Sequence, residues 1–457
     1  MNAIEFAEKV RNKEIDVLEH THKVLEKVEK LNKEYNYFNT ISSELAIELA
    51  EKLMKSPKGK LAGIPVSVKD CICVKGVETT AGSKILRGYK PVFNATAVER
   101  AIKEGAIIIG KTSQDEFGFG SFNVNVGVDF PIPKNPFDVT KACGGSSGGS
   151  AGITQIADFP HISIAESTGG SIACPASFCG VTGLTPTYGL VSRYGLIDYA
   201  SSLDKIGVMA KSSEECKLML DVIKGHDSND ATSLSEDYKE GKHSRIAVIK
   251  EALDVDENIK KIFLKFLEKN NIEYDTISLP LAAKYANPAY YLVATSEAST
   301  NLAKFCGFKY GAEFTLDDSF NDFFSKSRSL CFGKEAKRRI LMGTYARMAG
   351  FRDAFYLKAL KARTLIIKDY KEAFKHYDLL LSPAMPITAP KIDDISKLTP
   401  LQNYMMDVLT VGPNLAGLPH LNLTAGFHER MPVGAMAIAD HLNEGKLFSF
   451  GNNVKMV

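Results

Sequence analysis

The sequence has almost no excess charge of either sign and no long apolar run. Lysine and arginine total 56 and aspartate and glutamate total 54 in 457 residues, a formal net charge of +2. A protein that binds nucleic acid through bulk charge usually has a strong basic excess. No segment approaches the roughly 20 apolar residues of a membrane-spanning helix, and Glu5 and Glu8 occupy the place of a signal peptide's apolar core. We therefore expect a cytoplasmic protein without membrane contacts.

The sequence also lacks the cysteine and histidine patterns of metal and disulfide sites. None of its eight cysteines forms a CxxC pair, and there is no HExxH cluster. Disulfide frameworks belong to short secreted chains, so we interpret the cysteines as small buried thiols. We expect no metal ion and no cofactor on this chain.

Apolar strand-like segments alternate with helical ones along most of the chain. Hydrophobic residues make up 45% and charged residues 24%, which excludes an intrinsically disordered chain. The expected strands include 62–68, 106–109, 245–249 and 378–382, and the expected helices include 95–104, 211–224, 255–270, 334–349 and 353–373. This alternation predicts an α/β fold with a mainly parallel or mixed sheet.

The domain organisation follows from two changes in composition. Residues 1–60 have the spacing of an N-terminal helical segment, and the strand pattern begins at about residue 61. A polar run, 226–244, interrupts that pattern as a linker or a surface excursion. We predict that residues 61–457 form one large domain and that residues 1–60 pack with it as a compact unit.

Two short motifs suggest chemistry that their context does not favour. The segment 105–112, GAIIIGKT, fits the phosphate-binding pattern GxxxxGK[ST]. Its four middle residues are apolar and resemble a strand, so nucleotide binding at Lys111 is disfavoured. The segment 144–148, GGSSG, fits the nucleophile elbow GxSxG at Ser146, but no clear strand precedes it. The later histidines His420, His428 and His441 have no distinctive context.

A third constellation combines one lysine with two loops rich in glycine and serine. Lys69 ends the segment GIPVSVKD, Ser146 lies in GGSSGGS, and Ser171 lies in ESTGGSIACP. A serine hydroxyl needs a base to become a nucleophile, and a buried amine that is kept uncharged can serve. Alternation along a strand places Lys69 opposite the valines that anchor it. The backbone N–H groups around Thr168–Ser171 could converge on an oxyanion.

These residues resemble the amidase signature family. The matching segments are 63–70, 81–86, 105–121, 135–138, 144–152 and 167–207. The resemblance implies the amidase signature fold, a large mixed β-sheet flanked by helices on both sides. It also implies that Ser171 is the acyl nucleophile, Ser146 the bridging serine and Lys69 the general base, with Thr168, Gly169 and Gly170 forming the oxyanion hole.

The C-terminal half is similar to one branch of this family, the A subunits of tRNA-dependent amidotransferases, in segments 296–311, 327–346 and 412–423. This similarity implies hydrolysis of glutamine to glutamate and ammonia. The ammonia would pass to a B subunit that binds ATP, Mg²⁺ and the mischarged tRNA and amidates Glu-tRNA(Gln), Asp-tRNA(Asn) or both. A small C subunit would complete the complex. The alternatives are a stand-alone amidase and a non-catalytic scaffold subunit.

A glutamine site needs a cation for the α-carboxylate and an anion for the α-ammonium. By alignment, the resemblance implies Arg363 for the carboxylate, Asp407 for the ammonium, and Tyr310 in the lining of the pocket. Without the resemblance, Arg363 would be interpreted as a solvated helix charge.

The sequence departs from the family pattern around the nucleophile. Ser167 stands where relatives usually have aspartate, with Glu166 beside it, and Ala173 stands where they usually have arginine. Our hypothesis is that one structural salt bridge has been lost as a pair. The two serines are also one residue further apart than is usual, and the chain end after 432–439 looks too short for the closing helix of relatives.

Overall fold

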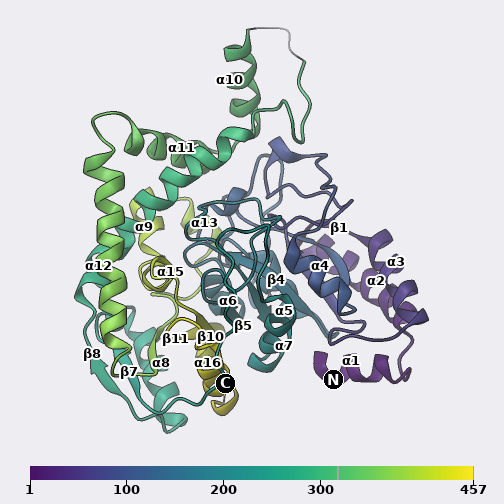
Figure 1. The fold of residues 1–457 in the computed structure, drawn as a ribbon, viewed down its shortest axis with the longest axis horizontal. Coiled ribbons are helices and arrows are strands. Elements are labelled where there is room, and N and C mark those ends of the chain that lie inside the picture. Colours follow the sequence, from purple (N-terminus) through teal and green to yellow (C-terminus); the bar gives the residue numbers. More distant parts are fainter. Residues whose placement is uncertain (316–318, 456–457) are drawn as a thin grey trace.

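A single mixed sheet of 11 strands organises the chain in the computed structural model, which describes residues 1–315 and 319–455 (Figure 1). The order across the sheet is β1-β3-β2-β4-β6-β5-β10-β11-β9-β7-β8. The strands are β1 (Phe38–Ile41), β2 (Pro65–Lys69), β3 (Ile107–Thr112), β4 (Ile162–Ser167), β5 (Thr182–Thr185), β6 (Lys205–Ala210), β7 (Ile246–Ile249), β8 (Asp275–Ile277), β9 (Leu379–Pro383), β10 (His420–His428) and β11 (Met431–Ala439). The predicted α/β fold with a mixed sheet is therefore confirmed.

Helices surround this sheet (Figure 1). They are α1 (Ala3–Arg11), α2 (Val17–Tyr35), α3 (Ser43–Lys55), α4 (Thr96–Lys103), α5 (Gly148–Ile156), α6 (Ala173–Cys179), α7 (Ser213–Ile223), α8 (Glu257–Lys269), α9 (Pro280–Asn301), α10 (Phe320–Cys331), α11 (Lys334–Arg347), α12 (Lys358–Ala373), α13 (Ile392–Ile395), α14 (Pro400–Met405), α15 (Val411–Leu415) and α16 (Glu444–Asn453). Within the described ranges, none of these helices combines the length and the apolar character needed to cross a bilayer.

The parallel part of the sheet determines where chemistry can occur. Strand β2 lies between β3 and β4 and runs parallel to both. The carboxyl ends of parallel strands meet at one edge of a sheet, so the end of β2 at Lys69 lies near the end of β4 at Ser167. Ligand sites of open α/β sheets commonly lie at such an edge.

The N-terminal segment takes part in the same sheet. Residues 1–60 form α1, α2 and α3, and β1 pairs antiparallel with β3. The polar run 226–244 contains no helix or strand. It is nevertheless tied to the surrounding structure, because Asp227 accepts hydrogen bonds from Thr96 and Ser192.

The chain end does fold as a helix, contrary to the impression that it is too short. Helix α16 packs against α7 and β10. Its apolar side chains Leu447, Phe448 and Phe450 are buried. Their spacing places them on the face that covers the sheet, which the short polar sequence around them obscured.

Helices α9 and α11 cross at very close range. A methyl group on Gly343 of α11 would lie 1.9 Å from the carbonyl oxygen of Thr295 in α9. Glycine is unfavourable in the middle of a helix, so the crossing itself requires it here. One turn before Gly343, Arg339 lies over the ring of Tyr291 with its guanidinium carbon 5.3 Å from the ring centroid. The close crossing thus holds an arginine against α9.

We expect Gly343→Ala to lower the free energy of unfolding by roughly 1–3 kcal/mol, because the added methyl overpacks the α9–α11 crossing. Chemical denaturation of both proteins measures the difference. Gly241→Ala is the matched control, since the nearest atom to its added methyl, Lys446 Cγ, lies 3.8 Å away. Equal losses in the two variants would contradict the importance of the crossing.

Candidate active site

A buried lysine at the end of β2 contacts both a serine and a glutamate. Lys69 Nζ lies 2.7 Å from Ser146 Oγ, 3.0 Å from the carbonyl oxygen of Glu166 and 2.8 Å from Glu166 Oε2. The Lys69 side chain is completely buried and that of Glu166 is 3% exposed. The structure therefore brings together Lys69 and Ser146, as the sequence predicted, and adds a carboxylate that the sequence analysis did not assign to the site.

Ser146 is held in a turn that only glycine permits. The Gly145–Ser146 peptide bond is cis, and a methyl group on Gly145 would lie 2.1 Å from Asp115 Oδ2. Asp115 accepts hydrogen bonds from the backbone N–H groups of Asn123 and Asn125. Burial raises the pKa of Asp115 to about 6, although these bonds and the charge of Lys69 oppose the rise. This buried carboxyl group fixes the loop on which Ser146 sits.

The loop 168–171 leads from β4 to α6 and carries unpaired donors. In the described part of the chain, no group accepts a hydrogen bond from the N–H of Gly169, Gly170 or Ser171. A methyl group on Gly169 would meet the Tyr290 ring at 2.7 Å, and one on Gly170 would meet Thr410 Oγ1 at 2.6 Å. The close packing explains both glycines, and the free N–H groups are the donors that an oxyanion hole requires.

Ser171 is the most accessible residue of the three predicted for the relay. Its exposed fraction is 6%, whereas Ser146 and Lys69 are both at 0%. It ends the loop of free N–H groups two residues before α6 begins, and the first turn of α6 is secured by a bond from Cys174 N to Gly170 O. Among the described residues no hydrogen bond joins Ser171 to Ser146 or Lys69, so the contact between the two serines stays a prediction.

Asp407 lies beside this loop. A methyl group on Gly170 would lie 3.4 Å from Asp407 Oδ1. The carboxyl group accepts hydrogen bonds from Ser121 Oγ at 2.9 Å and from Tyr291 OH at 2.5 Å. Burial raises the pKa of Asp407, while these two hydrogen bonds and the charge of Arg339 act in the opposite direction. The predicted anion is thus located next to the loop that ends in Ser171.

Arg339 is a buried cation that acts electrostatically on Asp407, and the sequence analysis missed it. Arg339 is 3% exposed and donates from Nε to Glu335 and from Nη1 to Tyr199 OH, at 2.8 and 2.7 Å. Its guanidinium also lies 5.2 to 5.6 Å from the ring centroids of four aromatic side chains: Phe119, Tyr199, Tyr291 and Tyr404. The i,i+4 pair of Glu335 and Arg339 is visible in the sequence, but only the fold shows that it is buried near Asp407.

Arg363 hydrogen-bonds to residues outside the Lys69 centre. Nε donates to the carbonyl oxygen of Leu415, Nη1 to Ser202 Oγ and Nη2 to the carbonyl oxygen of Ser202, at 2.8 to 2.9 Å. Each nitrogen donates one bond, so one hydrogen remains on each of Nη1 and Nη2. The side chain is partly buried, so Arg363 is not a freely solvated helix charge. Its predicted role at the α-carboxylate stays a prediction.

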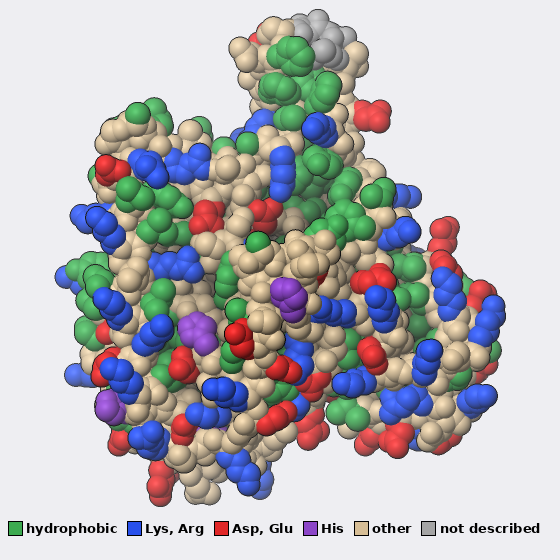
Figure 2. Space-filling model, viewed as in Figure 1, with side chains coloured by type: hydrophobic (Ala, Val, Ile, Leu, Met, Phe, Trp, Pro, Cys, Tyr) green, Lys and Arg blue, Asp and Glu red, His purple; other side chains and the backbone are tan. Residues whose placement is uncertain are grey.

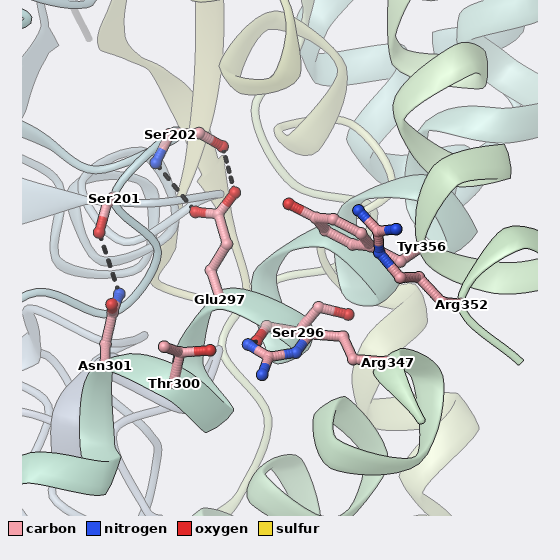
Figure 3. A pocket seen from close by; sticks show the side chains of 9 residues that line it. All are labelled: Ser201, Ser202, Ser296, Glu297, Thr300, Asn301, Arg347, Arg352 and Tyr356. Atoms are coloured by element: carbon pink, nitrogen blue, oxygen red, sulfur yellow. Dashed lines mark hydrogen bonds between the residues drawn. The ribbon is translucent and has the colours of Figure 1, made fainter. Parts of the chain in front are cut away.

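Ser202, which Arg363 contacts, lines a separate pocket of about 540 Å³ (Figure 3). In this view Glu297 points toward Ser202 and accepts its N–H and its hydroxyl at 2.9 and 2.6 Å, while Asn301 points toward Ser201. None of the residues that line this pocket belongs to the Lys69 centre. This pocket is therefore separate from the centre formed by Lys69 and Ser146.

Tyr310 lies at the rim of an aromatic cluster. It packs edge-on against Tyr89 and Phe305, with centroid distances of 5.6 and 5.9 Å, and it is 39% exposed. Phe305 in turn stacks on Phe117, the neighbour of Gly118, where an added methyl would lie 3.5 Å from Ser146 Oγ. Tyr310 is thus connected to the site only through other rings.

The structure argues against both a phosphate-binding loop at 105–112 and a nucleophile elbow at Ser146. Lys111 lies on β3 and is completely buried, with Nζ donating to Thr79 Oγ1 at 2.9 Å. GAIIIGKT is therefore a strand and no phosphate loop. Ser146 bonds to a lysine, and His420 is buried beside the carbonyl of Leu418. The arrangement is thus not that of a serine–histidine hydrolase.

Ser167 and Ala173 are both fully buried. The hydroxyl of Ser167 has no hydrogen-bond partner within the described ranges. The strand partner of Ser167 is Lys205 on β6, a buried lysine whose pKa burial lowers to about 7. Whether an ancestral salt bridge was lost at 167 and 173 stays a hypothesis.

Comparisons with known proteins agree with this geometry. The sequence pattern of the family described as Amidase matches residues 19–448. The chain belongs to the amidase family. It is 44% identical to the A subunit of Glutamyl-tRNA(Gln) amidotransferase from Archaeoglobus fulgidus, over 99% of this chain and 98% of that one. The Thermoanaerobacter pseudethanolicus protein of the same name is 42% identical, over 97% and 94%.

A solved structure also resembles this member of the amidase family closely. The crystal structure of the A subunit of Glutamyl-tRNA(Gln) amidotransferase from Thermotoga maritima superposes with a TM-score of 0.79 at 33% identity. The match covers 98% of this chain and 92% of that one. The expected resemblance to the amidase signature family and its fold is thereby confirmed.

We expect Lys69→Met to lower the free energy of unfolding by roughly 3 kcal/mol, because it leaves the buried Glu166 carboxylate without its cation. Lys205→Met is the matched control. Lys205 is equally buried but donates only to the carbonyl of Leu418 and forms no ion pair with another described residue. Denaturant titration at neutral pH should show a loss for Lys69→Met alone. A similar loss in both variants would contradict a specific role of the Lys69–Glu166 pair.

Proposed function

We propose that this chain is the glutamine-hydrolysing A subunit of a tRNA-dependent amidotransferase. The observation that carries the proposal is the hydrogen bond from the buried Lys69 to Ser146 beside a loop of free N–H groups. The end-to-end similarity to proteins named as A subunits supports the choice among amidases.

The proposed reaction uses the three residues as a relay. Ser171 Oγ attacks the side-chain amide carbon of glutamine and gives its proton to Ser146, which gives its own proton to Lys69. The N–H groups of the 168–171 loop hold the oxyanion, and Thr168, Gly169 and Gly170 shape it. The relay then returns a proton to the departing ammonia. Water releases glutamate from the γ-glutamyl ester by the same steps in reverse order.

The two charges beside the loop match those of an amino acid. We assign Asp407 to the α-ammonium of glutamine, because this buried carboxylate lies next to Gly170. We assign the α-carboxylate to Arg339 and keep Arg363 as the alternative, because Arg339 acts electrostatically on Asp407 while Arg363 bonds to Ser202. Tyr310 would line the outer pocket through its aromatic neighbours.

In this proposal the ammonia passes to a B subunit that holds ATP, Mg²⁺ and the mischarged tRNA, and a C subunit joins the two in the cytoplasm. The visible face of the molecule carries interspersed positive and negative side chains (Figure 2). Apolar side chains gather on the projecting arm that contains α10 (Figures 1 and 2). Phe308, Phe320 and Leu330 there are more than half exposed. An exposed apolar surface of this kind is typical of protein interfaces.

Two other functions remain to be separated from this one. A stand-alone amidase would act on amides that lack an α-carboxylate and would need no partner. A non-catalytic scaffold subunit, suggested by Ser167 and Ala173, would fail to react with an electrophilic glutamine analogue at Ser171. Ammonia release with and without the partner subunits distinguishes the first alternative.

We expect Ser171→Ala to reduce ammonia release from glutamine by about a thousandfold or more, because it removes the atom that forms the ester. Coupled measurement of ammonia in the assembled complex checks this. Ser177→Ala, a change in α6 at a hydroxyl that bonds only the Gly434 N–H, should retain activity. Wild-type rates in Ser171→Ala would refute the proposal.

We expect Arg339→Lys to raise the KM for glutamine by about tenfold with a smaller change in kcat, because lysine lacks the planar fork that binds a carboxylate. The matched variant Arg363→Lys should change KM by less than about threefold. Steady-state kinetics of both variants with glutamine decide between the two arginines. The reverse pattern would assign the carboxylate to Arg363.

A further inference from the structure

The amine of Lys69 has as many acceptors as an ammonium has hydrogens. Ser146 Oγ, Glu166 O and Glu166 Oε2 lie 2.7, 3.0 and 2.8 Å from Nζ, and an ammonium has three donors and no acceptor. A lysine in that state donates to Ser146 and cannot take a proton from it. A neutral amine fits the same three contacts, but a buried carboxylate in direct contact favours the ammonium, whereas the relay requires the neutral form.

A second buried carboxyl group shares one hydroxyl with Glu166. Thr168 Oγ1 donates over 2.8 Å to Glu166 Oε1 and to Asp204 Oδ1, yet a hydroxyl has a single hydrogen. The two carboxyl groups therefore compete for this donor. Burial and the charge of Glu166 raise the pKa of Asp204 well above its usual range, which favours the neutral form of Asp204.

The other charged and titratable groups described around Lys69 form no hydrogen bond or ion pair with its amine. Asp115, from the loop after β3, and the thiol of Cys71, just after β2, interact with Lys69 only electrostatically. Arg339 also acts electrostatically on Asp115. Glu166 is the carboxylate in direct contact with the amine among the described residues, and no solvent reaches either side chain freely.

We propose that Glu166 sets the protonation state of Lys69. The carboxylate stabilises the charged form of the amine, whereas the relay uses its neutral form. Removing the charge of Glu166 leaves a buried amine without a counter-ion, and burial then favours its neutral form. Glu166 is thus a positioning residue that acts through Lys69. The inference rests on the proposed relay of Lys69, Ser146 and Ser171.

The test is the pH dependence of Ser171 reactivity in wild type, Glu166→Gln and Glu166→Asp. The full chain is labelled with phenylmethylsulfonyl fluoride, an uncharged reagent that does not depend on glutamine binding, and labelled Ser171 is quantified by peptide mass spectrometry. We expect the acid limb of the labelling rate to move to lower pH by about one unit or more in Glu166→Gln, a tenfold change in rate on the limb. Glu166→Asp retains the charge on a shorter side chain, and its acid limb should move less than that of Glu166→Gln.

Each other outcome has a defined meaning. An unchanged acid limb in Glu166→Gln, or a slower rate with the same midpoint, assigns Glu166 a purely structural role and overturns the inference. If Glu166→Gln does not fold, Glu166→Ser removes the same charge with a smaller side chain and is held to the same criterion. Absence of labelling at Ser171 in the wild type at every pH would overturn the proposed function itself, a result distinguishable from an unshifted limb.

Discussion

The contact of Lys69 with Ser146 and Glu166 joins three segments that are far apart in the sequence. Lys69 ends β2, Ser146 lies in the turn before α5, and Glu166 lies near the end of β4. Full burial makes these contacts costly to break, because a charge left alone in the interior loses far more than a surface charge does. The positions of both serine loops therefore depend on this one amine.

The rest of the fold supplies what the contact needs. The parallel pairing of β2 with β3 and β4 places the lysine at the edge of the sheet where the loop 168–171 begins. On the other side, α9 and α11 cross at Gly343 and hold Arg339 among aromatic rings near Asp407. The sheet thus positions Lys69 for the relay that we propose. Helix α11 and the turn before α15 carry Arg339 and Asp407, the charges that we propose recognise the substrate.

The sequence was sufficient for much of the fold and for the contact of Lys69 with Ser146. Alternating apolar segments located β2, β3, β7 and β9 within a few residues, because buried strands with Gly and Pro at their ends are distinctive. The motif around Lys69, Ser146 and Ser171 indicated the family, which the comparisons confirm. Helix α9 was not predicted, because its apolar and polar residues follow no clear helical stripe and it is buried on several sides.

The features that the sequence did not reveal depend on contacts distant in the sequence. Arg363 and Arg339 both lie in helical segments rich in charge, so the sequence does not tell them apart. Only the fold shows that Arg363 donates to Ser202 and Leu415. It also shows that Arg339 lies over the ring of Tyr291. Glu166 was noted only as a neighbour of Ser167, since alternation along β4 would place it away from Lys69. Strand β4 ends at Ser167, and at this strand end Glu166 meets Lys69.

The most direct measurement of the central claim is the identity of the covalent intermediate. Glutamine is mixed with the assembled complex, the reaction is stopped with acid within one turnover, and the peptides are mapped by mass spectrometry. The relay predicts a γ-glutamyl ester on Ser171 that fails to accumulate in Lys69→Met. Ammonia release without an ester on Ser171, or an ester that forms equally fast without Lys69, would contradict it.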